Sequence, residues 1–391
     1  MKLEKFKQKN PKKVGIIIFT VACILLIAGV FFYTSFASFE VKQDFNIING
    51  TVGDPGDLYF AFYVDDVISK TMPQKGEGYV IDQEKTTCNN GASIEFNTDD
   101  WSIKVLNMTK SRTKCTLYFK KETIEDVILA NADPTEIAYD ETADNNLRYI
   151  GANQNNYISF NNELWRIIGA FNNIDDGTGK KETRLKIIRD EPYNESIAWD
   201  SSGQNNWTQA SLQKELNGTY LNTIQSSYKD MIGDAKWNIG GHSTNSATTL
   251  EFYTAERSTV VYNNNPYTWI GKIGLMYPSD YGYATSGGSK ADRNVCLNED
   301  IYNWYNSDLN DCSNNNWLYK EDADQWTLTP QTSFNRVFFI DNDKRVFDTT
   351  PDMISEDMVF GLSASPVIYL SSSVKISGGT GSSSDPFKLS L

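Results

Sequence analysis

Leu164-Trp-Arg-Ile-Ile-Gly-Ala-Phe171 is a β-prone run in the middle of the chain, and Arg184-Leu-Lys-Ile-Ile-Arg189 is a second one shortly downstream. Runs of this composition between turn residues predict strands. Helical spacing of apolar residues follows at 207–216, and a last core strand is expected at Val367–Leu370. This order of strands, helices and strands again predicts an α+β domain over residues 134–391, and disfavours alternating βαβ units.

Two local patterns add detail to this domain. Residues 222–232 predict a second helix. Arg336–Phe339 and Arg345–Phe347 flank the turn sequence Asp341-Asn-Asp-Lys344, which predicts a β-hairpin near the C-terminal end of the domain.

Upstream, the sequence predicts a smaller β domain at 49–120. Leu58–Val64 is an aromatic strand-like run, and shorter β-prone runs follow it between Asn, Asp and Gly turns. Glu122–Ala132 has near-helical apolar spacing and is followed by Asp133-Pro134, which ends a helix. We therefore expect a helical linker at 121–133.

The first 48 residues predict a membrane anchor. Val14–Tyr33 contains 20 residues without a charge, about the ~20 needed for a helix to cross a bilayer. Residues 1–13 hold six Lys and one Glu, which predicts a cytoplasmic tail and an exported body behind a stalk at 34–48. Ser35-Phe-Ala37 leaves open the alternative of a cleaved signal peptide, although the apolar run exceeds the usual 7–15 residues.

Charge and composition exclude several classes of protein. The formal net charge of -14 divides into +5 for residues 1–13 and -19 for the remainder. An acidic body lacks the basic footprint of a nucleic-acid binder. The chain of 391 residues is 40% hydrophobic and 13% aromatic, so it can build a core and does not resemble a disordered protein.

The cysteines also indicate an exported body. Cys23 lies in the apolar run, which leaves four cysteines outside it: Cys88, Cys115, Cys296 and Cys312. An even number suits disulfides in an oxidising compartment. Proximity and the domain boundary favour Cys88–Cys115 and Cys296–Cys312 among the three pairings. A zinc site, which lacks close C-x2-C pairs here, and four free thiols are the alternatives.

The larger domain contains a series of motifs in a distinctive order: Asp144-Asn-Asn-Leu-Arg-Tyr-Ile-Gly151, Phe160-Asn-Asn-Glu-Leu-Trp-Arg-Ile-Ile-Gly169, Ile273-Gly-Leu-Met-Tyr-Pro-Ser-Asp-Tyr-Gly282, Trp326-Thr-Leu-Thr-Pro330, Pro366-Val-Ile-Tyr-Leu370 and Val374-Lys-Ile-Ser-Gly-Gly-Thr-Gly381. Over about residues 140–391 this order resembles an uncharacterised exported domain of low-GC Gram-positive bacteria, often carried behind a single membrane anchor. More remotely, its ending is similar to that of C-type-lectin-like domains, which include formylglycine-generating enzymes and variable ligand-binding proteins. The resemblance implies a C-type-lectin-like α+β fold and no established activity.

No catalytic motif stands out. The lone His242, in Gly240-Gly-His-Ser-Thr244, lacks the G-x-S-x-G context of a nucleophile elbow. Cys296 and Cys312, the candidates for formylglycine-type oxidase chemistry, fit a structural disulfide better. The acidic loops at 175–177 and 341–343 lack the spacing of an EF-hand, so we expect no metal and no cofactor, with calcium left open.

Aromatic residues are the best candidates for ligand contact. Tyr and Trp are dense between residues 277 and 326, among Asn, Asp and Ser. Rings exposed in polar surroundings make recognition surfaces. We expect Trp165, Trp326 and Tyr369 in the core, and we single out four residues as candidate ligand contacts: Tyr281, Tyr283, Trp304 and Trp317.

The sequence thus favours a single-pass protein of the plasma membrane with an extracellular body, which displays a lectin-like domain for a glycan or a surface protein. An enzyme of the cell envelope on the same scaffold and a structural envelope component are the alternatives. A pocket of convergent polar groups near Tyr281 or Trp304 would favour the enzyme. A large self-complementary interface would favour the structural component.

Overall fold

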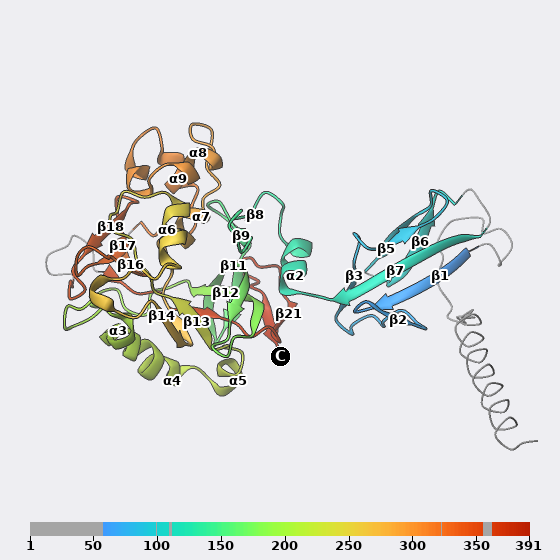
Figure 1. Ribbon diagram of the computed structural model, residues 1–391, viewed down its shortest axis with the longest axis horizontal. Helices are drawn as coiled ribbons and strands as arrows, with labels where there is room; N and C mark the ends of the chain where they lie inside the picture. Colours follow the sequence, from blue (N-terminus) through green and yellow to red (C-terminus); the bar gives the residue numbers. More distant parts are fainter. Residues whose placement is uncertain (1–57, 99, 109–111, 322, 355–361) are drawn as a thin grey trace, which may run out of the picture. The chain divides into compact units, whose positions relative to one another are not determined.

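The structure is a computed structural model that describes residues 58–98, 100–108, 112–321, 323–354 and 362–391 (Figure 1). Contacts divide the chain into two compact units, with the boundary between Glu122 and Thr123. The predicted tail, membrane helix and stalk at 1–48 lie outside the described residues. Within the described ranges, no helix combines the length and apolar character that crossing a membrane requires.

The smaller unit is built from strands. Its main sheet has the order β2-β1-β7-β3, with β4 also paired to β7, and β5 and β6 form a ladder of their own. The strand predicted at Leu58–Val64 is confirmed as β1, which runs parallel to β7. The strands of this unit are β1 (Leu58–Val64), β2 (Val67–Ser69), β3 (Tyr79–Ile81), β4 (Thr87–Cys88), β5 (Ser93–Asn97), β6 (Ser102–Leu106) and β7 (Thr113–Lys121).

One face of β7 carries the core of the smaller unit. Cys115, Leu117 and Phe119 are buried at alternate positions because successive side chains of a strand point to opposite faces. A disulfide joins Cys115 to Cys88 of β4 across a sequence separation of 27, as predicted. The buried hydrophobic cluster of this unit is small, so we expect the covalent link to stabilise it.

The larger unit is a mixed α+β structure with a seven-stranded sheet at its centre. The order of that sheet is β15-β20-β12-β11-β9-β8, and β10 pairs with β11. The strands of the sheet are β8 (Ile137–Tyr139), β9 (Leu147–Tyr149), β10 (Tyr157–Phe160), β11 (Glu163–Asp175), β12 (Lys181–Arg189), β15 (Ile273–Gly274) and β20 (Val367–Tyr369). The two runs on which the sequence prediction depends are therefore adjacent central strands, β11 and β12.

Smaller sheets surround the central one. A four-stranded sheet has the order β18-β17-β16-β19, and two further ladders join β13 to β14 and β21 to β22. The predicted hairpin is confirmed as β17 and β18. The bounds are β13 (Ala235–Asn238), β14 (Thr268–Gly271), β16 (Asp324–Pro330), β17 (Val337–Ile340), β18 (Val346–Thr349), β19 (Leu362–Ser363), β21 (Lys375–Gly378) and β22 (Lys388–Ser390).

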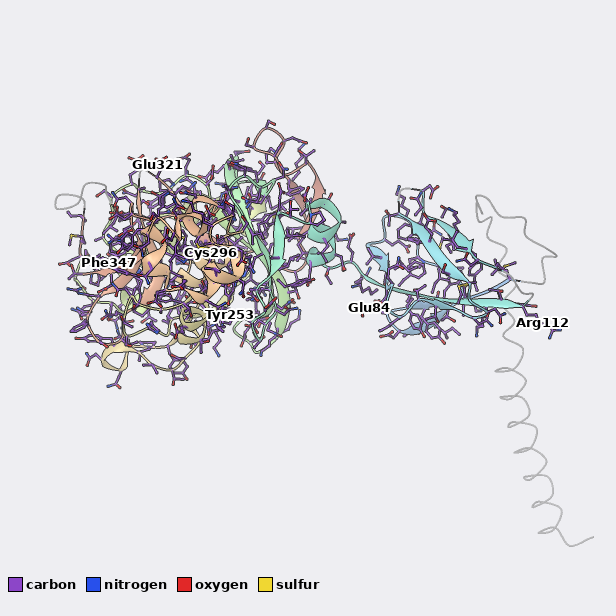
Figure 2. All side chains as sticks on the ribbon, turned by 90° about the horizontal axis from the view of Figure 1, so that it is seen from above. Glu84, Arg112, Tyr253, Cys296, Glu321 and Phe347 are labelled. Atoms are coloured by element: carbon purple, nitrogen blue, oxygen red, sulfur yellow. A yellow bond between two sulfur atoms is a disulfide. The ribbon has the colours of Figure 1, made fainter. Side chains whose placement is uncertain are left out.

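Short helices pack around these sheets (Figure 1), and side chains fill the interior of the unit (Figure 2). The α-helices are α2 (Ile124–Asn131), α3 (Ser211–Glu215), α4 (Leu221–Thr223), α5 (Ser226–Lys229), α6 (Thr249–Glu256), α7 (Pro278–Tyr283), α8 (Arg293–Asn298) and α9 (Asn310–Asn314). The 3-10 helices are η1 (Trp207–Gln209), η3 (Tyr262–Asn264) and η4 (Ile301–Tyr305), and η2 (Leu216–Tyr220) is a π-helix.

The predicted linker helix is present, but it belongs to the larger unit. Helix α2 begins at a capping box in which the Thr123 and Asp126 side chains each bond the other's backbone amide. Ile128 is buried in the main core, and Ile124 packs against it. The apolar face of α2 is thus covered by β11 and β12, so this segment is not a free connection.

The helix predicted at 222–232 is broken into α4 and α5. Ile224 between them is extended and buried in the core. The Asn161 side chain then accepts a hydrogen bond from the amide of Gln225 at 2.9 Å. The periodicity indicated one helix, but the backbone leaves the helical conformation at Ile224, whose side chain lies in the core.

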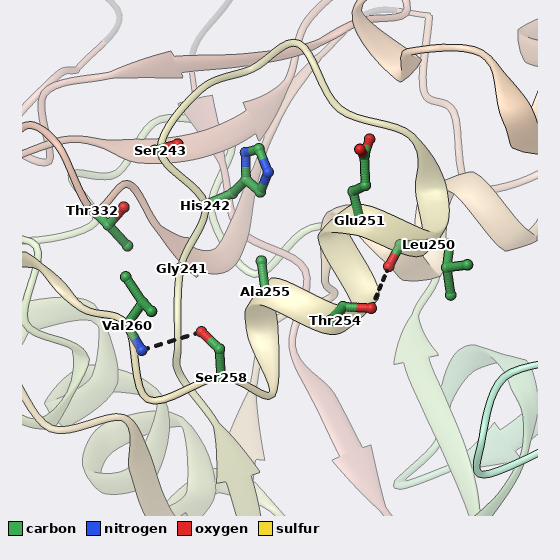
Figure 3. A pocket seen from close by; sticks show the side chains of 10 residues that line it. All are labelled: Gly241, His242, Ser243, Leu250, Glu251, Thr254, Ala255, Ser258, Val260 and Thr332. Carbon is green, nitrogen blue, oxygen red and sulfur yellow. Dashed lines mark hydrogen bonds between the residues drawn. The ribbon is translucent and has the colours of Figure 1, made fainter.

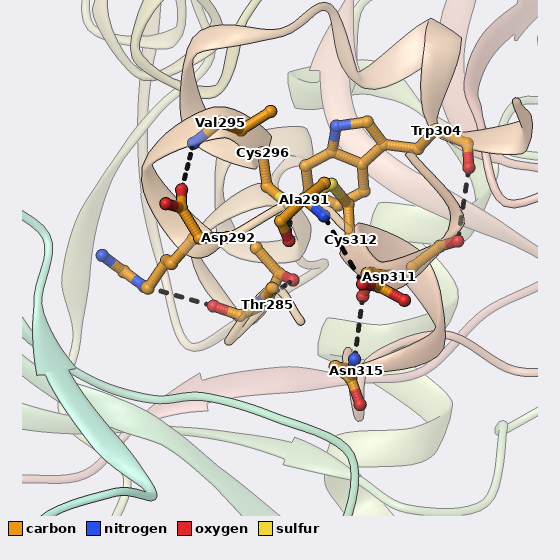
Figure 4. The surroundings of a disulfide bond; sticks show 12 residues. Thr285, Ala291, Asp292, Val295, Cys296, Trp304, Asp311, Cys312 and Asn315 are labelled. Atoms are coloured by element: carbon orange, nitrogen blue, oxygen red, sulfur yellow. Dashed lines mark hydrogen bonds between the residues drawn. A yellow bond between two sulfur atoms is a disulfide. The ribbon is translucent and has the colours of Figure 1, made fainter. Parts of the chain in front are cut away.

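The second predicted disulfide, Cys296–Cys312, joins α8 to α9 (Figure 4). Both cysteines are fully buried, and the ring of Trp304 lies beside them. The Asp311 carboxylate accepts a hydrogen bond from the amide of Lys290 at 2.7 Å. The disulfide therefore holds together a region that contains little regular structure.

Candidate functional site

A polar cavity of about 350 Å³ lies in the larger unit. It is lined by residues of β11, β12, β13, β14 and β20, the end of α6 and the loops that precede β9 and α7. Four asparagines contribute to its wall, namely Asn146, Asn172, Asn173 and Asn238, beside the rings of Phe171, Tyr277 and Tyr369. Amide groups next to aromatic rings can hold a polar ligand and fix its orientation.

A lysine lies directly behind the aromatic part of this wall. Lys186 of β12 is fully buried, and its ammonium nitrogen is 4.3 Å from the ring centre of Tyr277 and 5.0 Å from that of Phe171. The ring of Tyr369 is 5.5 Å away. These rings stabilise the cation through their negative faces.

Asp280 of α7 holds this lysine and a second buried cation. One oxygen of Asp280 accepts a bond from Lys186, and the other accepts one from Arg148 of β9 at 2.8 Å. Arg148 also donates to Asp140 at 2.9 and 3.0 Å. We call Lys186, Arg148, Asp140 and Asp280 the buried ion network. Two cations and two carboxylates compensate one another, which such deep burial requires.

Burial and pairing act against each other on the pKa values of the network. Burial lowers the pKa of Lys186 to about 8, although Asp280 acts in the opposite direction. Burial by itself raises the pKa of Asp280, but Lys186 and Arg148 outweigh this effect and the pKa is lowered below its usual value. The network therefore remains ionised at neutral pH.

Glu256, at the end of α6, is a third buried acid next to the cavity. Its carboxylate accepts hydrogen bonds from the amide and hydroxyl of Ser279 at 3.1 and 2.5 Å. The neighbouring Arg257, which lines the cavity, donates to it at 3.3 Å. Burial raises the pKa of Glu256 to about 7.

Glu256 makes stability depend on pH. The folded protein keeps the Glu256 proton up to a pKa of about 7, whereas the usual pKa is 4.5. The resulting stabilisation is fully present below pH 4.5 and is lost as the pH rises through 7. Glu256→Gln mimics the protonated form and does not titrate. The free energy of unfolding of the variant minus that of the unmodified protein should therefore be larger at pH 7.5 than at pH 5, measured by urea unfolding.

Asp324 is a second buried acid that affects the pH dependence. Burial raises the pKa of Asp324 to about 6, so both the unmodified protein and the Glu256→Gln variant lose some stability as the pH rises. The comparison therefore uses the difference between the two proteins. The same difference between variant and unmodified protein at pH 5 and pH 7.5 would contradict the raised pKa of Glu256.

The hydroxyl group of Tyr369 is an unused hydrogen-bonding group of the cavity. Tyr369 is 4% exposed and lines the cavity, and within the described ranges no hydrogen bond of its hydroxyl is found. By contrast, the hydroxyl of Tyr277 donates to the carbonyl of Asn238 at 2.9 Å. Tyr369 was expected in the core, and its ring is there, but its polar end remains available to a ligand.

The four aromatic residues predicted as ligand contacts lie in the core, and this corrects the expectation that they are exposed. Their exposures are 0% for Tyr281, 3% for Tyr283, 0% for Trp304 and 4% for Trp317. The rings of Tyr281 and Trp304 are 5.5 Å apart, and the Trp317 indole donates to the carbonyl of Tyr149 at 3.0 Å. They fill the interior around short helices, where large rings are needed for close packing. None of them lines the polar cavity.

His242 lies in a second, more open and apolar groove of about 500 Å³ (Figure 3). Helix α6 contributes Leu250, Thr254 and Ala255 to this groove. The Nδ1 atom of His242 is 2.7 Å from the carbonyl of Thr244, and no hydrogen bond joins His242 to Ser243 in the described structure. The geometry offers no serine nucleophile paired with this histidine.

The acidic loops considered for calcium use their carboxylates internally. Asp175 accepts bonds from the amides of Gly177 and Gly179 at 2.8 and 3.0 Å. Asp341 accepts one from Arg345 at 2.8 Å. Within the described ranges, no group of three or more His, Cys, Asp or Glu side chains is arranged to hold a metal ion.

The sequence contained one signal for the buried ion network. Lys186 interrupts the apolar run Leu185-Lys-Ile-Ile188, and a charge inside such a strand must find a buried partner. That partner, Asp280, is 94 residues away in the sequence, and no pattern connects the two.

Comparisons of the chain with family models, with curated proteins and with solved structures found no match.

Proposed function

We propose that this chain is a single-pass cell-surface protein whose extracellular larger unit binds a saccharide in the polar cavity. The observation that carries the proposal is the lining of that cavity, in which side-chain amides and tyrosine rings converge. Its volume of about 350 Å³ lies in the range of roughly 300–1,000 Å³ usual for ligand sites. A sugar presents both hydroxyl groups and apolar C–H faces, which such a lining matches.

The sequence supports the proposed location, in which the chain is anchored in the membrane and its body is exported. The uncharged run at Val14–Tyr33 and the basic residues before it favour a membrane helix with the body outside the cell. The two disulfides are in keeping with an oxidising compartment.

A C-type-lectin-like assignment of the larger unit is also part of the proposal. The first and last segments of the unit lie together, since the amide of Tyr157 donates to Gly381 and that of Phe387 donates to Tyr157, at 2.8 and 2.9 Å. Between them lies a long region of short helices and loops tied by the Cys296–Cys312 disulfide. Adjacent end segments with a long loop-rich region between them suit that fold.

Binding is favoured over catalysis. The buried charged groups beside the cavity are already paired: Asp280 accepts a bond from Lys186, and Glu256 accepts two bonds from Ser279. The aromatic rings of the wall lie between the Lys186 ammonium and the cavity. The network therefore supports the wall, and its groups are not aimed at a bound ligand.

A glycan array probed with the full-length protein in detergent tests this proposal. We expect binding to a subset of glycans, and Tyr369→Phe should weaken it about three- to tenfold because one hydrogen bond is lost. Tyr305→Phe is the matched control, because Tyr305 is 49% exposed and lies outside the cavity. Absence of binding to every glycan, or equal losses in both variants, would overturn the proposal.

A further inference from the structure

The free hydrogen-bond donors of the polar cavity identify the class of saccharide. Resting on the proposed function, we infer that the ligand is an acidic sugar, whose carboxylate is recognised by Lys181 and Lys236 while the Tyr369 hydroxyl donates to one of its oxygens. The inference depends on which polar groups of the lining are already occupied by the protein and which are not.

Two lysines of the lining are available. Lys181 begins β12 and Lys236 lies on β13, and both side chains are exposed. Within the described ranges neither lysine forms an ion pair or a side-chain hydrogen bond, although Lys181 lies opposite Asp175 in the β11–β12 ladder. Both ammonium groups can therefore donate to a ligand.

The carboxylates of the same lining are largely occupied. Asp144 accepts bonds from the hydroxyl of Tyr253 and from the amide side chain of Asn173, the latter at 3.1 Å, and its oxygen lies 3.6 Å from Arg257. Asp175 accepts two backbone amides of its own turn, both at Oδ1. Each lining carboxylate thus already has donors from the protein, whereas the ammonium groups of Lys181 and Lys236 can donate to a ligand that is rich in acceptors.

The remaining charges do not cancel this preference. In the buried ion network behind the wall, two carboxylates balance two cations. Arg257, also in the lining, is shared between Asp144 and Glu256. The lining thus holds three cations, Lys181, Lys236 and Arg257, against the two carboxylates of Asp144 and Asp175, so the cavity is locally positive on a chain whose net charge is -14. Such a local charge favours an anionic ligand.

The third donor makes the site more than a pair of surface lysines. Tyr369 is 4% exposed, and its unpartnered hydroxyl belongs to the cavity lining. A buried phenol donates a hydrogen bond and stays neutral, because burial raises its pKa well above the usual range. A charge at the mouth and a neutral donor within the wall suit a sugar acid, in which a carboxylate is attached to a ring of hydroxyl groups.

The test compares α-1,4-linked digalacturonic acid with its dimethyl ester, measured by calorimetry on the full-length protein in detergent. Esterification removes the charge and keeps the sugar. We expect the acid to bind at least about tenfold more tightly than the ester, and its affinity to fall as salt is raised from 50 to 300 mM. Equal affinities would overturn this inference but leave saccharide binding intact.

Substitutions of the two cavity lysines test whether these residues produce the preference for the acid over the ester. Lys181→Ala and Lys236→Ala should each weaken binding of the acid about three- to tenfold, and the double variant should remove the preference for acid over ester. Lys388→Ala is the matched control, since Lys388 is an exposed lysine of β22 outside the cavity. Unchanged affinity in the double variant would overturn the inference. If neither disaccharide binds, the uronate assignment fails, and the glycan array separately decides whether saccharide binding fails too.

Discussion

Asp280→Ala should lower the free energy of unfolding of the protein by about 3–5 kcal/mol, the usual cost of removing one partner from a buried ionic group. Asp280 is 1% exposed and is the common acceptor for Lys186 and Arg148. Its loss leaves Lys186 without a carboxylate in an aromatic enclosure, whereas Arg148 retains Asp140. Urea unfolding at pH 7 measures the change.

The control for this prediction replaces both partners together. In the double variant Asp280→Leu with Lys186→Met, two apolar side chains stand in place of the ion pair, and Arg148 keeps its carboxylate partner Asp140. We expect a loss below about 1.5 kcal/mol, or a gain, as for other buried ion pairs replaced by apolar residues. Asp343→Ala, at an acid whose side chain is 62% exposed, should change stability by less than about 0.5 kcal/mol. Equal losses in Asp280→Ala and Asp343→Ala would contradict the role assigned to the network.

Joint replacement of Cys88 and Cys115 by Ala should destabilise the smaller unit by about 3.5 kcal/mol. The disulfide closes a loop with a sequence separation of 27, and the loss of chain-closure entropy for such a loop gives this magnitude. The unit has few buried apolar side chains to compensate for the change. Hydrogen exchange of the peptides that contain β1 and β7 should therefore become much faster.

The second disulfide provides the comparison. Joint replacement of Cys296 and Cys312 by Ala removes a disulfide of the larger unit and leaves Cys88–Cys115 intact. Hydrogen exchange in β1 and β7 should therefore stay as it is in the unmodified protein. Exchange should instead rise in α8 and α9. Unchanged exchange in β1 and β7 after loss of Cys88 and Cys115 would show that the small core is sufficient without the covalent link.

Two features of the larger unit connect stability to binding. The rings of Phe171, Tyr277 and Tyr369 face Lys186 and also belong to the cavity lining. Any change that displaces the ammonium group therefore disturbs the wall against which a ligand would lie. For this reason the binding tests use Tyr369→Phe and the two cavity lysines, and they leave the buried ion network intact.

Local structure could be predicted from the sequence because it depends on nearby residues. Strand β1, the β17–β18 hairpin and helix α2 follow from periodicity and turn residues. Both disulfides were expected from cysteine spacing. The prediction of one helix at 222–232 was wrong, because the chain becomes extended at Ile224, which packs in the core between α4 and α5.

The aromatic cluster shows what composition cannot determine. Tyr281, Trp304 and their neighbours are embedded in polar sequence, which is equally typical of a recognition surface and of a core made from short helices. Only packing distinguishes the two, because burial depends on which distant elements cover a side chain.

The sequence by itself determined the α+β class, the preferred pairing of the cysteines and the central strands β11 and β12, since each of these depends on spacing within a few dozen residues. Only the tertiary structure decided the site. The polar cavity takes its unused donors from Lys181, Lys236 and Tyr369, which are far apart in the chain and share no motif. Sheet pairing of β12 with β20 brings distant segments together, and that pairing results from burial of the whole core.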